Sequence, residues 1–318
     1  MKNELAKRIF ILSVPLLLAV GLALFFTGRL IKKEKATEIR SPYLYADTRQ
    51  LVDLVEEAAG LMEQQGEKVF ETLKQKDSRW LNKHHYFFVY DIKGKCIFHP
   101  VEPHLVGRNL MNLRDMNGKL LIREITQIGE KPGRSESGWV FYLWEEGMQI
   151  SPMWKSSYIR KVIGPDGKIY LIGCGSYDIK IEKEFVRERV GMAADLIAAR
   201  GSDVAFREFR NPASPFYFLD TYIFVLGMNG KALVDPAYPT FEGRDLSRFK
   251  DVVGHEVVQE MLQKLAHAGE AWVQYLWPRP GDTVPSRKLA YVRKVRVGQE
   301  ELIVGADFFL ATPIWMKI

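Results

Sequence analysis

Residues 88–110 read FVYDIKGKCIFHPVEPHLVGRNL, and residues 224–246 read FVLGMNGKALVDPAYPTFEGRDL, which is the same pattern displaced by 136 residues. The alignment needs no gap, and its identities are Phe88/Phe224, Val89/Val225, Gly94/Gly230, Lys95/Lys231, Pro100/Pro236, Pro103/Pro239, Gly107/Gly243, Arg108/Arg244 and Leu110/Leu246. Two apolar runs around a glycine-containing turn predict a β-hairpin, and the prolines and glycine that follow predict an irregular crossing loop. Because solenoid units run only about 20–50 residues, a repeat at this spacing indicates a duplicated domain.

The repeat continues beyond the hairpin at an offset of 133 residues. WVFYLW at 139–144 matches WVQYLW at 272–277, and the lysine, tyrosine and arginine of residues 155–161 recur in 288–294. The last apolar run, LIGCGSYD at 171–178, matches LIVGADFF at 302–309 through Gly173/Gly305 and Tyr177/Phe309. In the first copy the expected strands are 85–91, 95–99, 138–144, 155–162 and 168–177, with a short helix near 120–128. We therefore predict an α+β protein of two tandem modules, each a five-stranded antiparallel sheet led by a long helix.

Long helical stretches precede both modules. In the first stretch, apolar residues recur at helical spacing from Leu51 to Leu73, and the predicted helix runs from Pro42, with Ser41 as its N-cap, to about Lys76. Its apolar stripe either packs along the modules or pairs with a second subunit, and packing is the simpler interpretation. A second helical stretch, residues 180–209, has a similar pattern.

The segment from Ile9 to Thr27 contains no charged residue. At about 1.5 Å per residue it is long enough to cross the roughly 30 Å hydrocarbon core of a bilayer. A cleaved signal peptide is the alternative, but its apolar region is shorter, and FFTGR at 25–29 is a poor cleavage site. We expect one uncleaved transmembrane helix. Lysines and arginines flank it on both sides, so the charge pattern does not by itself place the body outside the cytoplasm.

Composition argues against several classes of function. The 318 residues are 47% apolar, which supports two hydrophobic cores. The net charge of +6 arises largely beside the apolar N-terminal segment and not from a basic run with interleaved aromatics, so nucleic-acid binding is not expected. Two cysteines are too few for a disulfide scaffold or a zinc cage. The sequence contains no nucleophile–base pair, HExxH, P-loop or dinucleotide fingerprint, so we expect no catalysis, metal or other cofactor.

The ordered motifs YFFVYDIKGKCIFHP, GRNL, Asp115-x-x-Gly118, GWVFYLW, KSSYIRK and GCGSY resemble the Cache domains, the extracellular PAS-like sensor modules of bacterial chemoreceptors and histidine kinases. The resemblance is to Cache type 2, covers most of residues 45–310, and is looser in the second module. It implies the strand order 2-1-5-4-3 in each sheet, a long N-terminal helix, and a ligand pocket over one face of the sheet. It also implies that small carboxylates are typical ligands.

The resemblance further implies that the first module is distal from the membrane and the second proximal. The expected domains are a membrane anchor at 1–35, a long helix at 36–79, module 1 at 80–180, and a connecting helix with module 2 at 181–318. Only nine residues follow Phe309, which departs from the receptor pattern of a second span and an output domain. We therefore expect a single-pass protein of the inner membrane with its body in the periplasm or extracellular space. Its expected partners are a second copy bound through the long helix and a separate histidine kinase or chemoreceptor.

A pocket for a small anion needs fixed positive charge, oriented donors and apolar walls. In module 1 the candidate residues are His99, Trp139, Tyr142, Trp144, Lys155, Tyr158, Arg160 and Tyr177. Strand alternation puts Lys155 and Tyr158 on opposite faces, so either one of them is structural or Lys155 lies at an irregular strand start. The candidates in module 2 are Asp235, Tyr275, Lys288, Tyr291 and Asp307. Aspartates replace His99 and Gly175 in module 2, so the two pockets are not expected to bind an identical ligand.

Two classes of function remain in competition. A sensor requires a pocket that binds a small molecule without turnover. A structural or assembly protein of the cell envelope would instead have filled modules, in which the repeated lysines and tyrosines serve only packing. We favour the sensor, because the resemblance covers most of the chain.

The two cysteines test the implied strand order. Cys96 lies on the second strand and Cys174 on the fifth, and the first strand separates them. With strands about 4.8 Å apart, the two Cα atoms should be roughly 10 Å apart or more, whereas a disulfide needs them within about 7 Å. We therefore predict two buried, unjoined thiols.

Overall fold

The computed structural model describes residues 41–133, 136–145, 151–177, 179–279 and 282–310. The predicted transmembrane segment from Ile9 to Thr27 lies outside these residues. Within the described ranges, no helix combines the length and the apolar character that a membrane span requires.

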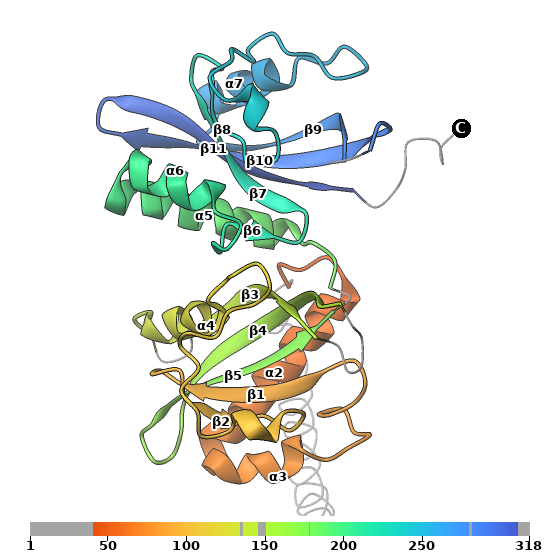
Figure 1. Cartoon of the computed structure of the whole chain (residues 1–318), viewed down its shortest axis with the longest axis vertical. Coiled ribbons are helices and arrows are strands. Elements are labelled where there is room, and N and C mark those ends of the chain that lie inside the picture. Colours follow the sequence, from red (N-terminus) through yellow and green to blue (C-terminus); the bar gives the residue numbers. More distant parts are fainter. Residues whose placement is uncertain (1–40, 134–135, 146–150, 178, 280–281, 311–318) are drawn as a thin grey trace, which may run out of the picture. The chain divides into compact units, whose positions relative to one another are not determined.

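Module 1 contains one antiparallel sheet in the order β2-β1-β5-β4-β3, which confirms the predicted order (Figure 1). Its strands are β1 (Tyr86–Asp91), β2 (Cys96–Phe98), β3 (Ser137–Trp144), β4 (Met153–Ile163) and β5 (Ile169–Ser176). The register pairs Tyr142 on β3 directly with Lys155 on β4. These two side chains therefore project from the same face of the sheet.

Module 2 repeats the same order and adds one short strand. Its strands are β6 (Tyr217–Phe218), β7 (Thr221–Gly227), β8 (Ala232–Val234), β9 (Glu270–Pro278), β10 (Pro285–Val297) and β11 (Glu300–Phe309). The path β8-β7-β11-β10-β9 corresponds to that of module 1, while β6 pairs with the start of β7. Tyr275 pairs with Lys288, which repeats the Tyr142–Lys155 pair of module 1.

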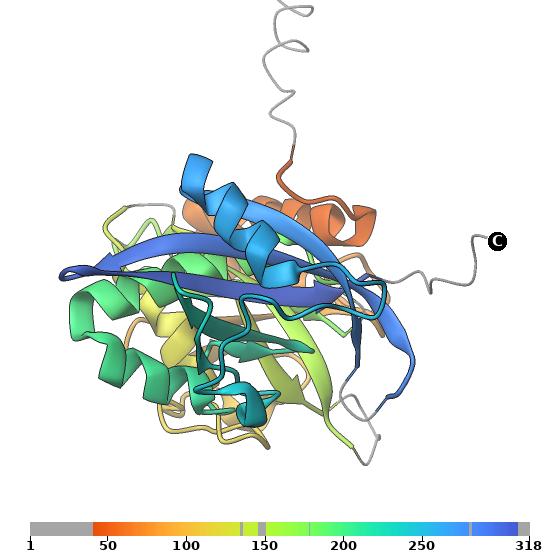
Figure 2. The same ribbon diagram turned by 90° about the horizontal axis from the view of Figure 1, so that it is seen from above.

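Helices cover both faces of each sheet, and each face has its own hydrophobic core. In module 1, α2 (Ala46–Gln65) packs on one face and α4 (Leu121–Glu130) on the other. In module 2, α5 (Lys183–Arg200) and α6 (Ser202–Arg210) lie on one face and α7 (Val257–His267) on the other, as Figures 1 and 2 show. Both faces of each sheet are therefore buried, and alternation along a strand separates two interiors.

The first long helix is shorter than the sequence predicts. It begins at Ala46 instead of Pro42, because the buried carboxylate of Glu182 accepts hydrogen bonds from the backbone N–H groups of Leu44 and Tyr45, both at 2.8 Å. It ends at Gly66, whose φ of +59° is disfavoured for residues with a side chain, and continues as a 3₁₀ turn (η1, Gly66–Val69) and the single turn α3 (Phe70–Leu73). The predicted N-cap at Ser41 and the unbroken rod were wrong.

The apolar stripe of this helix packs inside module 1, as the simpler interpretation predicts. Its buried members are Leu51, Val55, Ala58, Met62, Val69 and Leu73. The second helical stretch is also interrupted: α5 ends and α6 begins around Gly201, whose φ is +80°. Both rods thus break at a glycine with positive φ.

Cys96 and Cys174 are both buried and free. They lie on β2 and β5, with β1 hydrogen-bonded between these strands. The predicted pair of unjoined thiols is confirmed, together with the strand order from which it was drawn.

Candidate ligand-binding sites

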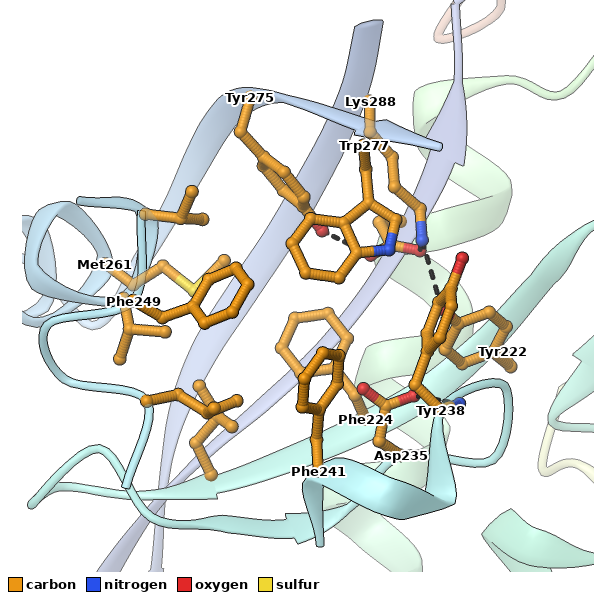
Figure 3. A pocket seen from close by; sticks show the side chains of 15 residues that line it. Tyr222, Phe224, Asp235, Tyr238, Phe241, Phe249, Met261, Tyr275, Trp277 and Lys288 are labelled. Carbon is orange, nitrogen blue, oxygen red and sulfur yellow. Dashed lines mark hydrogen bonds and ion pairs between the residues drawn. The ribbon is translucent and has the colours of Figure 1, made fainter. Parts of the chain in front are cut away.

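Module 2 contains a cavity of about 70 Å³ between its sheet and α7. Figure 3 shows side chains that reach into it from β7, β9 and β10 and from the segment that follows β8. The polar and charged lining residues are Tyr222, Asp235, Tyr238, Tyr275, Lys288 and Asp307. The walls are apolar and aromatic, and they include Phe224, Phe241, Phe249, Met261 and Trp277. Since one water needs roughly 10–15 Å³ by this measure, the cavity has room for a ligand of a few heavy atoms.

A buried carboxylate occupies the centre of the polar side of this cavity. Lys288 Nζ lies 2.8 Å from Asp307 Oδ1, and the Tyr275 hydroxyl donates a hydrogen bond of 2.6 Å to Asp307 Oδ2. Lys288 Nζ also donates to the Tyr222 hydroxyl at 3.0 Å. Both charged side chains are almost fully buried, so their pairing offsets a desolvation penalty of several kcal/mol per ion.

Asp235 is the second carboxylate of the cavity. Its Oδ1 accepts a hydrogen bond from the backbone N–H of Tyr238, which closes the turn after β8. Burial, the largest cause, and the charge of Asp307 together raise the pKa of Asp235 to about 6, against the lowering effects of the Tyr238 hydrogen bond and of Lys288. This carboxyl group therefore titrates close to neutral pH.

Module 1 has the same arrangement with different charges. Tyr86, Tyr142 and Lys155 occupy the positions of Tyr222, Tyr275 and Lys288, and their alternation puts them on one face of the sheet. Lys155 is fully buried, and its Nζ lies 3.6 Å from the centre of the Tyr86 ring and 5.3 Å from that of Tyr177. The hydroxyls of Tyr142 and Ser157 share a hydrogen bond of 2.9 Å.

Gly175 stands in module 1 where Asp307 stands in module 2. A Cβ atom at Gly175 would lie 2.2 Å from Ser157 Oγ and 2.7 Å from Lys155 Cε, so these two side chains fill the space that a larger residue would need. The module 1 equivalent of Ala290 is Ser157, which faces Gly175 across the β4–β5 ladder. Position 175 therefore contributes no carboxylate beside Lys155, whereas Asp307 contributes one beside Lys288.

His99 and Tyr177 complete the polar side of the module 1 site. His99 Nδ1 accepts a hydrogen bond from the backbone N–H of Glu102 at 3.0 Å, the same turn-closing role that Asp235 has in module 2. Burial, the largest cause, and the positive charge of Lys155 together lower the pKa of His99 to about 3, so its imidazole is neutral at physiological pH. The Tyr177 hydroxyl donates to the carbonyl oxygen of Glu145.

The cavity next to His99 in module 1 has a much smaller volume than the module 2 cavity. Its volume is about 10 Å³, room for a single water, and its lining includes Tyr86, His99, Tyr142 and Trp144. A second cavity of about 370 Å³ shares Trp144 with it and is lined on its polar side by Glu102, His104, Arg108, Arg114, Asp115 and Glu145. Trp144 therefore separates a small buried site from a wider polar one.

Three module 1 candidates lie on the opposite face, in the core against α2. The Trp139 indole donates to the Tyr43 hydroxyl, and the Tyr158 hydroxyl donates to Glu56 of α2. Arg160 forms an ion pair of 2.9 Å with the same glutamate. Strand alternation thus separates Trp139, Tyr158 and Arg160 from Lys155. Tyr158 and Arg160 attach α2 to the sheet, and Trp139 holds the segment that precedes this helix.

Tyr291 of module 2 is placed in the same way. It packs in the core that faces α5, and its hydroxyl donates to Glu270 at the start of β9. The other four module 2 candidates, Asp235, Tyr275, Lys288 and Asp307, line one cavity.

Sequence reasoning missed several lining residues. Tyr86 and Tyr222 obey the 136-residue offset and precede the quoted repeat by only two positions, so extending the alignment would have found them. Tyr238, Phe241 and Trp277 also line the module 2 cavity. Tyr238 and Phe241 stand where module 1 has Glu102 and Leu105, so these two positions follow no repeated pattern. Among the described residues, no group of three or more His, Cys, Asp or Glu side chains is arranged to hold a metal ion.

Comparison with known proteins identifies the family. The family model described as a Cache domain, of the double Cache type, matches residues 48–191 and 207–308. Over 103 residues, 32% of this chain, the sequence is 31% identical to the methyl-accepting chemotaxis protein McpP of Pseudomonas putida, and the match covers 18% of that protein. The chain therefore spans about a fifth of the length of this curated relative.

Two solved structures illustrate the similarity. A Cache chemosensory domain studied for carboxylic acid recognition is 25% identical and covers 40% of this chain and 92% of its own, with a TM-score of 0.35. The periplasmic sensory domain of the Campylobacter jejuni chemoreceptor Tlp1 is 10% identical over 83% of this chain and 90% of its own, with a TM-score of 0.28. From the family match, the duplicated sequence and the two sheets of order 2-1-5-4-3, we conclude that this chain belongs to the Cache domain family of ligand-binding sensor modules, as a tandem of two modules.

Proposed function

We propose that this chain is an extracytoplasmic sensor whose module 1 binds a small carboxylate through Lys155 and Tyr142 and whose bound state is read by a separate signalling protein. The expected setting is a single-pass protein of the inner membrane, anchored by the segment from Ile9 to Thr27. The family match supports the sensor role. The geometry of the two sites supports the class of ligand.

One observation carries the choice of a carboxylate. In module 2 the buried Lys288 and Tyr275 hold a carboxylate, that of Asp307, at 2.8 and 2.6 Å. In module 1 the paired residues are again a lysine and a tyrosine, and glycine replaces the aspartate. Asp307 is therefore an intramolecular stand-in for the ligand that we assign to module 1.

The electrostatics of module 1 favour an anion. Lys155 is fully buried, and its neighbour His99 is neutral because burial holds its pKa at about 3. A buried ammonium group pays a desolvation penalty of several kcal/mol, which an anionic ligand offsets. The nearby rings of Tyr86 and Tyr177 attract the ammonium through their faces and leave its charge in place.

The cavity volume limits the ligand and requires motion. An acid of two to four carbons does not fit about 10 Å³, so its entry requires the small cavity to open toward the wider one beside Trp144. A ligand with about 4–6 heavy atoms gains at most about 1.5 kcal/mol per atom, which limits its dissociation constant to the micromolar range or weaker. We expect modest affinity.

Calorimetry on the full chain with a panel of acids from acetate to pyruvate and succinate tests this proposal. Lys155→Met, which keeps the length of the side chain and removes its charge, should weaken binding about 10–150-fold, because it removes a charge-assisted bond. Lys168→Met changes an exposed lysine of the same module and should leave the affinity unchanged. The proposal fails if no acid gives heat or a melting shift at millimolar concentration, or if Lys155→Met binds as tightly as the unmodified chain.

A filled, non-binding envelope protein remains the second candidate, and one observation favours it. The module 1 cavity is no larger than a water molecule, as a purely packed core would have it. The two candidates differ in the acid titration, since a filled module gives no saturable heat and no difference between Lys155→Met and Lys168→Met.

The partners are the least constrained part of the proposal. The apolar stripe of α2 packs inside module 1. The exposed positions of this helix include Asp53, Glu56, Glu57 and Glu63. Because the apolar stripe is already buried in the module 1 core, a homodimer through α2 would need contacts from the exposed side of the helix. Crosslinking in membranes, with and without acid, tests the dimer, and recovery of monomer alone in both states would remove it.

A further inference from the structure

The charges that line the module 2 cavity do not cancel. The cavity contains two carboxylates, Asp235 and Asp307, and one ammonium group, Lys288. Lys288 and Asp307 form a buried ion pair of 2.8 Å, so their charges balance. Asp235 is left as the net charge of the cavity, and the carboxylate site beside Lys288 is already filled from within the chain.

Aromatic side chains form much of the remaining wall. The ring centres of Tyr238, Phe241 and Trp277 lie 5.7–5.9 Å from one another, and Phe249 lies 5.4 Å from Trp277. Figure 3 shows Tyr238 and Phe241 beside Asp235, on the side of the cavity opposite Tyr275. Aromatic faces next to a carboxylate attract an ammonium group, through the ring quadrupoles and the fixed negative charge together.

We propose that the module 2 cavity binds a small organic cation, such as an alkylamine or a methylated ammonium ion, with Asp235 as its counter-ion and the rings of Tyr238, Phe241 and Trp277 around it. An anion is disfavoured here, because Asp235 repels it and Lys288 is engaged by Asp307. The volume of about 70 Å³ limits the ligand to a few heavy atoms. This assignment goes beyond the module 1 proposal and depends on none of its residues.

The titration of Asp235 gives the site a characteristic pH dependence. Burial raises the pKa of Asp235 to about 6, so the counter-ion is ionised at pH 8 and largely neutral at pH 5. The charged groups that face it are Asp307 on β11, Lys288 on β10 and Glu242 after η3 (Pro239–Phe241), and Glu242 is itself paired with Arg210 of α6. Because an aliphatic amine stays protonated over this range, weaker binding at pH 5 reports the carboxyl group and not the ligand.

The test is a titration of the full chain with methylamine and with tetramethylammonium, as chloride salts at pH 8, followed by calorimetry. We expect saturable binding that Asp235→Asn weakens by at least about tenfold, the loss expected for one charge-assisted contact. Asparagine keeps the Oδ1 atom that accepts from Tyr238, so the turn is retained and only the charge is lost. His99→Asn, at the equivalent position of module 1, is the matched control and should leave amine affinity unchanged.

Several outcomes would overturn the assignment. Sodium chloride at equal concentration could produce the same response as both amines, or Asp235→Asn could bind them as tightly as the unmodified chain. Amine affinity that does not fall between pH 8 and pH 5 would likewise contradict a role for Asp235. Failure of the acid panel concerns Lys155 alone, and failure of the amine titration concerns Asp235 alone, so the two proposals are separable.

Discussion

In module 1 the last strand of the sheet places Gly175 beside the buried lysine, and in module 2 it places Asp307 there. The turn after the second strand is closed by His99 in one module and by Asp235 in the other. The two tyrosines and the lysine are the same in both pockets, whereas Tyr238 replaces Glu102 and Ala290 replaces Ser157. Two of these differences, His99 to Asp235 and Gly175 to Asp307, add two carboxylates beside the lysine of module 2.

This difference shows how the charge of a pocket can change between two copies of a duplicated domain. The strand order and the helix on each face are the same in both copies, so the hydrophobic cores tolerate the change. Asp235 and Asp307 line the module 2 cavity, and His99 lines that of module 1. Charge at the pocket is thus free to diverge while the tyrosine–lysine frame is retained.

The largest expected effect comes from removal of the internal carboxylate. Asp307→Ala leaves Lys288 buried without its counter-ion and should destabilise the chain by about 3–5 kcal/mol in urea unfolding. The double variant Lys288→Met with Asp307→Ala removes both charges and should recover much of this loss.

Acetate sharpens the same experiment. If Asp307 stands in for a ligand, millimolar acetate should stabilise Asp307→Ala, since a ligand that binds only the folded state raises the free energy of unfolding. It should have no such effect on the double variant. Equal stability of the single and double variants would contradict the idea that the ion pair is mutually required.

A smaller effect is expected from building the internal carboxylate into module 1. Gly175→Asp alone would clash with Ser157, so the change is combined with Ser157→Ala, which reproduces the Ala290 and Asp307 pair of module 2. The new aspartate should bind Lys155 and weaken the binding of small acids about 10–150-fold, because the charge-assisted contact is already made. Ser157→Ala alone is the control. Undiminished acid binding in the combined variant would place the anion site elsewhere.

Much of the fold followed from the sequence, because the repeat and the strand alternation are local signals. Alternation correctly separated Lys155 from Tyr158, but it did not indicate which face holds the ligand, since helices bury both faces. The start of α2 was missed because Glu182, 138 residues away from Leu44, replaces the local cap. Cavity volumes depend on how side chains of non-repeated loops, such as Tyr238 and Phe241, pack against the sheet, and no sequence period reports that.

The smallest expected effect is a difference of sign in pH dependence at the two equivalent turn positions. Burial lowers the pKa of His99 from 6.5 to about 3, so on acidification the unfolded chain gains a proton before the folded chain does. Its contribution to stability is therefore lost as the pH falls below about 6.5. Burial raises the pKa of Asp235 from 3.8 to about 6, so the folded chain gains a proton first, and its contribution improves as the pH falls from about 7 toward 4.

Urea unfolding of the full chain at pH 7.5 and pH 5.0 separates these two contributions. Relative to the unmodified chain, His99→Asn should gain about 1–2 kcal/mol of stability on going to pH 5.0, because the variant has no imidazole to protonate. Asp235→Asn should be more stable than the unmodified chain at pH 7.5 and should lose about 1 kcal/mol of that advantage at pH 5.0, where Asp235 is itself neutral. Each variant's stability, measured relative to the unmodified chain, could instead change in the same direction for both variants between pH 7.5 and pH 5.0. That result would mean that the two turn positions share one electrostatic environment. In that case the opposite pocket charges, and with them the two different ligand classes, would have no basis.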